Sequence, residues 1–520
     1  MHFFVWAKKC QETHQHCMLD RYAFYPQGVQ CASPQKAWQK RLYHMVASRC
    51  KNHFSLLANG YRDLNKVIEQ LVNLKRTLRI LANEWLVQWF QGFKNVQLFA
   101  RQIVPRRNLI VPHEMSVKIR REGRLLIANF LICISSQNRN LVLHFSKGKS
   151  MRNNIIDNIR GLCMLGVIGI HIGGSLGLAP NNFTLYCFLE VLSRYSVPAF
   201  FFISGYGLVC NDKNLLTGSS LNYLEFLKKR LRGAGLPYLS WSLFYLAYFT
   251  MVLPKGMISW HPLHIAFVLF FGLACYHLYF MVILLWFYAS YPLWRSMLRW
   301  INKHSIALGS ALLFIFQLAF NWWTTHPGID ASQWSLLAKN FFNYRLNYLP
   351  LHYLLIFMSG GLAALHWQKF MDLLRTHSVS VILFYIASIA YTAGSSYYSF
   401  TYEKYTLLDI ANTYHQLSPQ GLVYTIASIL FFCWALDKLE QAKRTKYIDI
   451  LSKYSMLIYF IHPLILEWMT SLYTKFGIVM TVKKVTFSYF FLVAAALAAS
   501  VLLTKIFKYT PMLRKLFTGK

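Results

Sequence analysis

The sequence VTFSYFFLVAAALAASVLLT, residues 485–504, contains no charged side chain along its whole length. A helix of about 20 residues spans roughly 30 Å, which is the thickness of the hydrocarbon core of a bilayer. Its apolar residues do not repeat at a helical period of 3.6, so the pattern does not indicate a helix with one buried face. This stretch therefore predicts a transmembrane helix.

Similar apolar blocks follow one another from residue 155 onward. The composition agrees, because 55% of the residues are hydrophobic and only 14% are charged, against about 25% charged residues in soluble domains. We therefore predict an all-α, polytopic integral membrane protein and reject a large soluble helical protein. A shorter apolar stretch, 261–275, is expected to be re-entrant or interfacial. The ten predicted spans are 159–178, 186–209, 234–253, 277–293, 305–323, 349–367, 378–393, 420–436, 455–473 and 485–504.

The positive charge of the chain, formally +35, is distributed between these blocks. If the residues before the first block are cytoplasmic, the segments expected inside contain 22 Lys/Arg and those expected outside contain 7. An excess of Lys and Arg in cytoplasmic loops is the usual signature of membrane orientation. We therefore predict that both ends lie in the cytoplasm. Because orientation explains much of the charge, no nucleic-acid partner is expected.

Residues 1–150 differ from the rest, with 24 Lys/Arg against 7 Asp/Glu and no apolar block long enough to span a bilayer. Met151 begins MRNNIIDNIRG, a natural start for a membrane protein. The codons of Lys147-Gly148-Lys149 are purine-rich, as a bacterial ribosome-binding site is. We expect translation to begin at Met151, with 1–150 as untranslated upstream sequence. A basic cytoplasmic extension that contacts anionic lipid or nucleic acid is the alternative.

Arg160 and His171 stand out because polar groups are unfavourable inside a bilayer, where a charged side chain costs at least about 2.5–3.5 kcal/mol. Eleven helical steps make three turns and about 16 Å, so both side chains are expected on one side of the first span. His171 then lies near the bilayer centre, where a neutral imidazole can act as a general base. Interhelical hydrogen bonding is the alternative role of His171, and interfacial anchoring that of Arg160.

Two further groups of charged residues lie at or inside the predicted spans. Glu190 and Arg194 are one helical turn apart, and mutual pairing is as plausible as a functional role. Lys228, Lys229, Arg230 and Arg232 form a cluster at the inner end of the third span. Four cations would attract a phosphate-bearing cytosolic donor, and membrane anchoring is the alternative.

Three other spans contain histidines that could belong to a site. His277 lies at the outer start of the fourth span, and His462 is followed by Pro463 in the ninth. His352 and His366 lie near the ends of the sixth span and are weaker candidates. The ten cysteines include no CxxC pair and no metal-ligand spacing, so we predict no metal site.

The order of these residues resembles membrane acyltransferase family 3, also called the O-acyltransferase family. The similarity covers residues 151–520, with Lys229 where Arg is usual and with a Gly-Ala-Gly-Leu insertion between Arg232 and Pro237. The stretches that carry it are Asn158-Ile-Arg160-Gly161 through His171, Arg194-Tyr-Ser-Val-Pro198 through Ser204-Gly205-Tyr206, Lys229-Arg230-Leu-Arg232 before Pro237-Tyr238, His277-Leu-Tyr-Phe280, and Ser452-Lys-Tyr454-Ser455 through Tyr459-Phe-Ile-His462-Pro463.

The resemblance implies transfer of an acyl group, often acetyl, from cytoplasmic acyl-CoA to a hydroxyl of an exported or lipid-linked glycan. Acyl-CoA would be a substrate, and no bound cofactor is expected. The location implied is the inner (plasma) membrane. On this interpretation His171 and Arg160 are the catalytic pair, and Lys229, Arg230 and Arg232 bind the donor. Further candidate polar residues are Glu190, Arg194, Ser204, His277, Tyr454, Ser455 and His462.

A polysaccharide exporter of the same fold is the alternative function, because polar spans could equally line a path for sugars. Arg160, His171 and the basic cluster favour the enzyme, since an exporter needs no site for CoA. The acyl group, the sugar and the oligomeric state are not set by the sequence.

Overall fold

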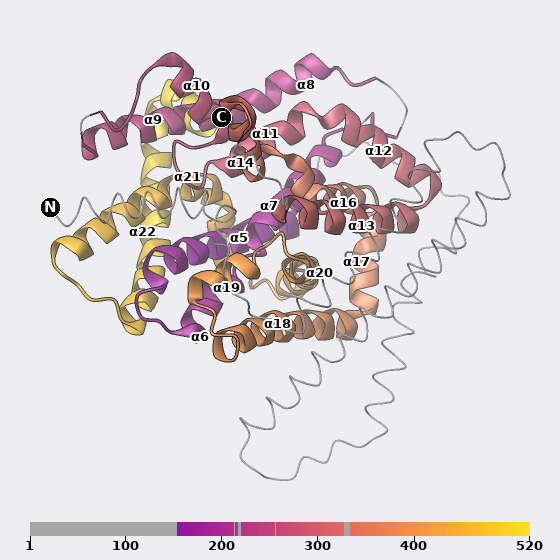
Figure 1. Ribbon diagram of the computed structural model, residues 1–520. Helices are drawn as coiled ribbons and strands as arrows, with labels where there is room; N and C mark the ends of the chain where they lie inside the picture. The colour runs from indigo at the N-terminus through magenta and orange to yellow at the C-terminus, as the bar shows by residue number, and fades with distance from the viewer. Residues whose placement is uncertain (1–152, 213, 217–219, 255, 327–332) are drawn as a thin grey trace, which may run out of the picture. The chain divides into compact units, whose positions relative to one another are not determined.

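The structure, a computed structural model, describes residues 153–212, 214–216, 220–254, 256–326 and 333–520 (Figure 1). These residues all belong to one compact unit, and those in regular secondary structure form helices, with no strand. The expectations for residues 1–150 and for initiation at Met151 lie outside the described residues.

The described helices follow one another along the chain. Several contain a π-helical turn, and one short 3₁₀ helix begins at Pro350. The helices are α5 (Asn154–Ile172), α6 (Phe183–Tyr186), α7 (Ser196–Cys210), α8 (Tyr223–Arg230), α9 (Leu236–Val252), α10 (Pro262–Phe271), α11 (Tyr279–Ala289), α12 (Tyr291–His304), α13 (Ile306–Thr325), α14 (Leu336–Asn343), α15 (Arg345–Tyr348), α16 (Leu354–Leu365), α17 (Trp367–Thr376), α18 (Ser378–Thr401), α19 (Leu407–Thr413), α20 (Pro419–Gln441), α21 (Lys446–Lys475), α22 (Val482–Tyr509) and α23 (Pro511–Thr518), with π-helical turns η1 (Gly173–Gly177), η2 (Cys187–Val191) and η3 (Leu231–Gly235) and the 3₁₀ helix η4 (Pro350–Tyr353).

Within the described part of the chain, seven helical segments are long and apolar enough to cross a membrane, judged by length and composition. They coincide with seven of the ten predicted spans: Asn154–Gly177, Phe183–Cys210, Ile306–Thr325, Ser378–Thr401, Pro419–Gln441, Lys446–Lys475 and Val482–Tyr509.

The other three predicted spans correspond to shorter helices. They are α9, α11 and the segment Pro350–Leu365, which comprises η4 and α16. The span predicted at 277–293 overruns the end of α11, because Pro292 sits in the first turn of a separate amphipathic helix, α12. The apolar stretch 261–275 contains the ten-residue α10, which is too short to span.

Polar side chains cap the start of several apolar helices. A helix leaves its first four N–H groups without partners inside the helix, and a side-chain oxygen just before it can satisfy them. Asn153 accepts hydrogen bonds from the amides of Ile155 and Ile156 at the start of α5. Ser305, Ser418 and Thr481 cap α13, α20 and α22 in the same way. These caps explain why the helices begin where they do.

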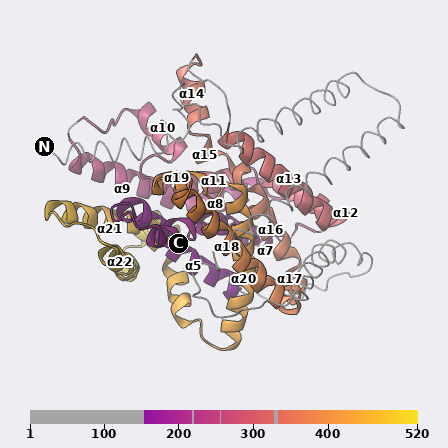
Figure 2. The same cartoon turned by 60° about the horizontal axis from the view of Figure 1, so that its bottom comes forward.

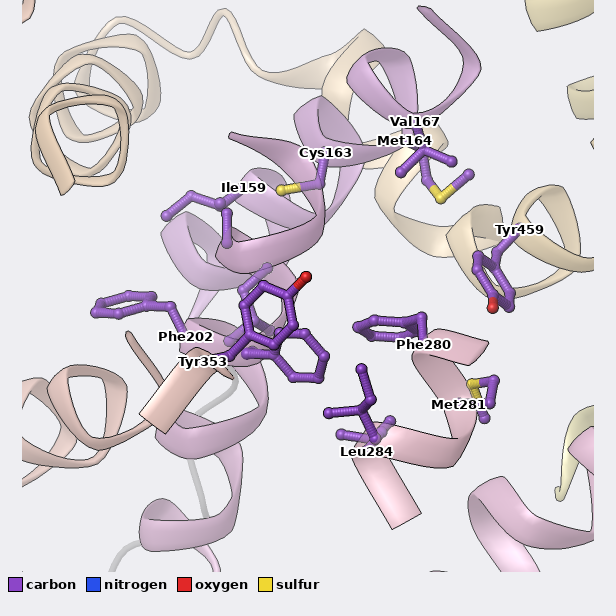
Figure 3. Packing of buried hydrophobic residues seen from close by; sticks show 14 of the residues in the cluster. Ile159, Cys163, Met164, Val167, Phe202, Phe280, Met281, Leu284, Tyr353 and Tyr459 are labelled. Atoms are coloured by element: carbon purple, nitrogen blue, oxygen red, sulfur yellow. The ribbon is translucent and has the colours of Figure 1, made fainter. Parts of the chain in front are cut away.

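Helix α5 packs against α7, α20, α21 and α22, and it runs through the middle of the described helices (Figures 1 and 2). Most of its side chains are buried, including Ile159, Cys163, Met164 and Val167. They belong to one large hydrophobic cluster that also contains residues of α7, α11 and α21, several of which are labelled in Figure 3. The first predicted span is therefore enclosed by protein rather than by lipid.

Helices α7 and α16 pack with their backbones in close approach. A Cβ placed on Gly205 would lie 2.0 Å from the carbonyl oxygen of Phe357, and one on Gly360 would lie 2.0 Å from that of Phe202. No side chain fits there without moving backbone. Small residues that let two backbones approach are typical of helix packing in membranes.

We therefore expect Gly205→Ala to destabilise the protein by about 1–3 kcal/mol or more, the usual effect of overpacking. Gly207→Ala is the matched control on the same helix, because a Cβ there would meet nothing within 4 Å. Thermal unfolding of the purified variants in detergent checks this. Equal melting temperatures for the two variants would contradict the close contact.

Candidate functional site

Three imidazoles from separate parts of the chain lie together in the interior. His171, in the last turn of α5, has its ring centroid 5.2 Å from that of His462 on α21, and the two rings are stacked. The ring of His277, just before α11, lies 5.6 Å from that of His462. The ring of Tyr276 also lies near that of His171, with 4.7 Å between ring centroids. The structure thus brings together the three histidines that the sequence singled out most strongly.

The ring of His462 has a defined orientation. Its Nδ1 lies 2.9 Å from the carbonyl oxygen of Ile458. A carbonyl can only accept a hydrogen bond, so Nδ1 carries the hydrogen and Nε2 is the basic nitrogen of the neutral ring. This Nε2 is buried and has no hydrogen-bond partner among the described residues. Pro463 follows directly and has no N–H, so the carbonyl of Tyr459, one residue beyond Ile458, has no helical hydrogen-bond donor.

His277 is held by its backbone while its ring nitrogens remain available. The carbonyl oxygen of His277 accepts a hydrogen bond of 2.7 Å from the hydroxyl of Tyr459. Tyr245 and Tyr459 contact its ring edge to face, with centroids 5.6 Å and 4.9 Å away. The side chain is buried, and neither ring nitrogen has a hydrogen-bond partner within the described part of the chain. Buried polar atoms are normally paired, so two such nitrogens indicate a place for a polar ligand atom.

A second cluster of polar residues lies around Arg160, about three helical turns before His171 on α5. The guanidinium of Arg230 is placed over the rings of Phe226 and Tyr288, 5.3 Å and 5.6 Å from their centroids. Arg160, Arg230 and Ser204 all lie near the hydroxyl of Tyr288, and the Ser204 hydroxyl donates a hydrogen bond of 2.8 Å to the carbonyl of Phe200. Arg160 also forms an ion pair of 3.0 Å with Asp157. Two cations and two hydroxyls from four different helices therefore converge, which suits an anion such as phosphate.

Two antiparallel segments of chain connect the histidine cluster around His171 with the cationic cluster around Arg160. Along α5, Arg160 and His171 are about 16 Å apart. The side chain of Tyr288 lies near Arg160, and that of Tyr276 lies near His171. Arg160 precedes His171 along the chain whereas Tyr288 follows Tyr276, so the segment 276–288 runs antiparallel to α5. Between the ends, both segments contribute buried apolar side chains to one cluster, including Met164, Val167, Phe280 and Leu284 (Figure 3).

The remaining cations of the basic cluster do not converge with this group. Lys228, Lys229 and Arg232 are exposed, whereas Arg230 is half-buried. Arg232 lies in η3, where its carbonyl contacts the backbone near Gly519. Of the three predicted donor-binding residues, the structure therefore places Arg230 over the ring of Tyr288 and leaves Lys229 and Arg232 at the surface.

Glu190 and Arg194 are paired with each other and are both buried. Arg194 also donates a hydrogen bond of 3.2 Å to the side-chain oxygen of Gln416. Glu190 packs against Gly173, just beyond the end of α5. This contact places the pair at the α5–η2 interface, where it joins the second span to the loop before α20.

Tyr454 and Ser455 lie on the part of α21 that packs against the start of α5. The Ser455 hydroxyl donates to the carbonyl of Ser452, whose own hydroxyl donates to the carbonyl of Asp157. The Tyr454 ring is covered by Lys453, with its ammonium 5.3 Å from the centroid. These contacts join two helices and include neither group of the site.

Residues 153–505 match a sequence family described as an acyltransferase domain, acyltransferase family 3. The match covers more than half of the chain. The chain belongs to the acyltransferase-3 family. This membership, with the seven apolar helices, makes it a membrane protein and supports a membrane acyltransferase activity. No curated protein and no solved structure matches the sequence.

Four residues of this acyltransferase-3 protein lie at the site but were not selected from the sequence: Tyr276, Tyr288, Tyr459 and Glu467. Tyr276 and Tyr288 could have been found as aromatic residues at the two ends of the span that begins at His277. Glu467 interacts electrostatically with Tyr276 and Cys275, and it was detectable as a carboxylate inside a predicted span. Tyr459 stands in the stretch Tyr459-Phe-Ile-His462-Pro463 that carries the family resemblance, but tyrosine is common in these helices, so its polarity alone did not distinguish it.

Proposed function

We propose that this acyltransferase-3 protein is a membrane O-acyltransferase. It transfers an acyl group, most simply acetyl, from a cytoplasmic acyl-CoA to a hydroxyl of a cell-envelope or exported glycan. The proposal places it in the inner membrane with ten spans and both ends in the cytoplasm. The donor is a substrate, and the acceptor is a glycan or a lipid-linked sugar.

The observation that supports it best is that a cationic cluster around Arg160 and a histidine cluster around His171 lie about 16 Å apart on the same helix, α5. CoA has phosphates at one end and a thioester at the end of a long flexible arm. Arg160 and Arg230, with the Tyr288 and Ser204 hydroxyls, provide donors for the phosphates. The apolar stretch of α5 and α11 suits the arm, and His171 lies about 16 Å from Arg160, where the thioester would arrive.

The reaction needs a base that takes one proton. His171 accepts the proton of the acceptor hydroxyl as the oxygen attacks the thioester carbonyl carbon. The C–S bond then breaks, and the imidazolium returns the proton to the departing sulfur, which gives an ester and free CoA. His462, stacked on His171 with its Nε2 available, and Tyr276 orient the base and the hydroxyl. General-base action of this kind contributes about 10²–10⁴-fold.

The direct test is the structure of the envelope glycan in a strain that lacks the gene. We expect NMR or mass spectrometry to show loss of one ester-linked acyl group, restored by the wild-type gene. A glycan that keeps all its acyl groups but is no longer exported would instead favour the polysaccharide-export alternative. An unchanged and normally exported glycan would contradict both functions.

A further inference from the structure

We infer that a buried ion pair on the loop after α7 acts as a latch that positions the donor-binding helix α8. The latch consists of Asp212, Arg295 and the hydroxyl of Tyr291. The inference rests on the proposed function, because it concerns how Arg230 is held for the donor. It assigns a positioning role to three residues outside the site.

The ion pair at the centre of the latch is bidentate and buried. Arg295 Nε lies 2.6 Å from Asp212 Oδ2, and its Nη2 lies 3.4 Å from Oδ1. Both side chains are at most 7% exposed. Arg295 also donates to the carbonyl of Asn214 at 2.7 Å, and Arg299 donates to that of Leu215 at 2.9 Å. Two arginines of α12 therefore fix the loop that leaves α7.

Tyr291 connects this ion pair to α8. Its hydroxyl donates a hydrogen bond of 3.0 Å to Asp212 Oδ2. Its ring is fully buried and stacks on that of Phe226, with 5.0 Å between centroids. Tyr223 adds a second contact, donating from its hydroxyl to the carbonyl of Ala289 at 2.7 Å. Helix α8 is thus attached to the junction of α11 and α12 by two aromatic residues.

Helix α8 depends on these contacts because none of its eight residues is buried. Arg230 lies one turn after Phe226, and its guanidinium rests over the Phe226 ring. Any shift of Phe226 on Tyr291 therefore moves Arg230 relative to Tyr288 and Arg160. Loss of the latch should weaken donor binding and leave the chemistry at His171 unaffected.

The experiment uses the full chain in lipid nanodiscs, with acetyl-CoA as the probe. Tyr291→Phe removes one hydroxyl and keeps the ring on Phe226, and Asp212→Asn removes the charge. We expect each to raise the Kd for acetyl-CoA by about three- to tenfold, as loss of a buried hydrogen bond does. The value of kcat at saturating donor should change by less than about twofold.

The matched control is Asp437→Asn. Asp437 is also a buried carboxylate paired with an arginine, Arg375, at 2.8 Å, and it joins α17 to α20 rather than touching α8. It should lower stability and leave the Kd unchanged. Combining Tyr291→Phe with Phe226→Ala should add little to the effect of Phe226→Ala alone, because both act through one contact.

Two results would overturn the inference, and they differ in meaning. If the wild type binds acetyl-CoA and both latch variants bind it equally well, Asp212 and Tyr291 only stabilise the fold. If the wild type itself does not bind acetyl-CoA, the donor assignment fails, and the latch has no donor to position. Because Tyr291→Phe is a minimal change, the test remains available if Asp212→Asn fails to accumulate.

Discussion

His171→Gln is expected to accumulate normally in the membrane and to lose acyl transfer by about 10²–10⁴-fold. An amide can replace an imidazole as a partner in a hydrogen bond between helices, so a packing role would tolerate the change. It cannot take up a proton near neutral pH, so a general base would not. Acylation of the glycan and membrane abundance should be measured on the same samples.

Two histidines serve as controls for this variant. His366 hydrogen-bonds to Asn302 at 2.6 Å and lies at the end of α16. His352 is as buried as His277 and His462, more so than the half-buried His171, and contacts Asn321 at 3.3 Å in a separate polar network. Both Gln variants should stay active. If His171→Gln keeps more than about a tenth of the activity, the loss expected of a general base is absent. His462, with its available Nε2, then becomes the candidate base.

The apolar blocks predicted the helical fold well because lipid imposes a simple length rule. Seven blocks are long helices, and this signal needs no knowledge of packing. The rule is less informative where helices are short. Helix α11 has 11 residues and ends where Tyr291-Pro292 starts a new helix. The π-helical turn Gly173–Gly177, which begins two residues after His171, depends on local packing that sequence periodicity does not encode.

The site was predictable to the extent that its residues are polar within apolar surroundings. That rule selected Arg160, His171, His277 and His462. It could not distinguish Arg230 from its neighbours Lys229 and Arg232, because all three have the same charge and differ only in what packs around them. The rule also missed Tyr276 and Tyr288, whose hydroxyls become informative only when folding places them beside His171 and Arg160.

Arg230→Ala is expected to raise the KM for acetyl-CoA by about 10- to 100-fold, which corresponds to loss of a hydrogen bond to a charged group. Arg160→Ala should have a similar effect, since both guanidiniums lie near the Tyr288 side chain. Arg230→Lys should recover only part of the loss. An ammonium keeps the charge and lacks the planar fork that binds phosphate and stacks between the rings of Phe226 and Tyr288.

The double variant Lys229→Ala with Arg232→Ala is the comparison for Arg230→Ala, and it removes one positive charge more. It removes two cations from the same turn of chain, yet both are exposed, where solvent and salt screen their attraction for a phosphate. We expect it to raise the KM by less than about fivefold, and less still at high salt. Initial rates at limiting and saturating acetyl-CoA give the KM of each variant. If the double variant weakens the donor more than Arg230→Ala does, the phosphates bind at the exposed cations, and the convergence of Arg160 and Arg230 serves the fold rather than the donor.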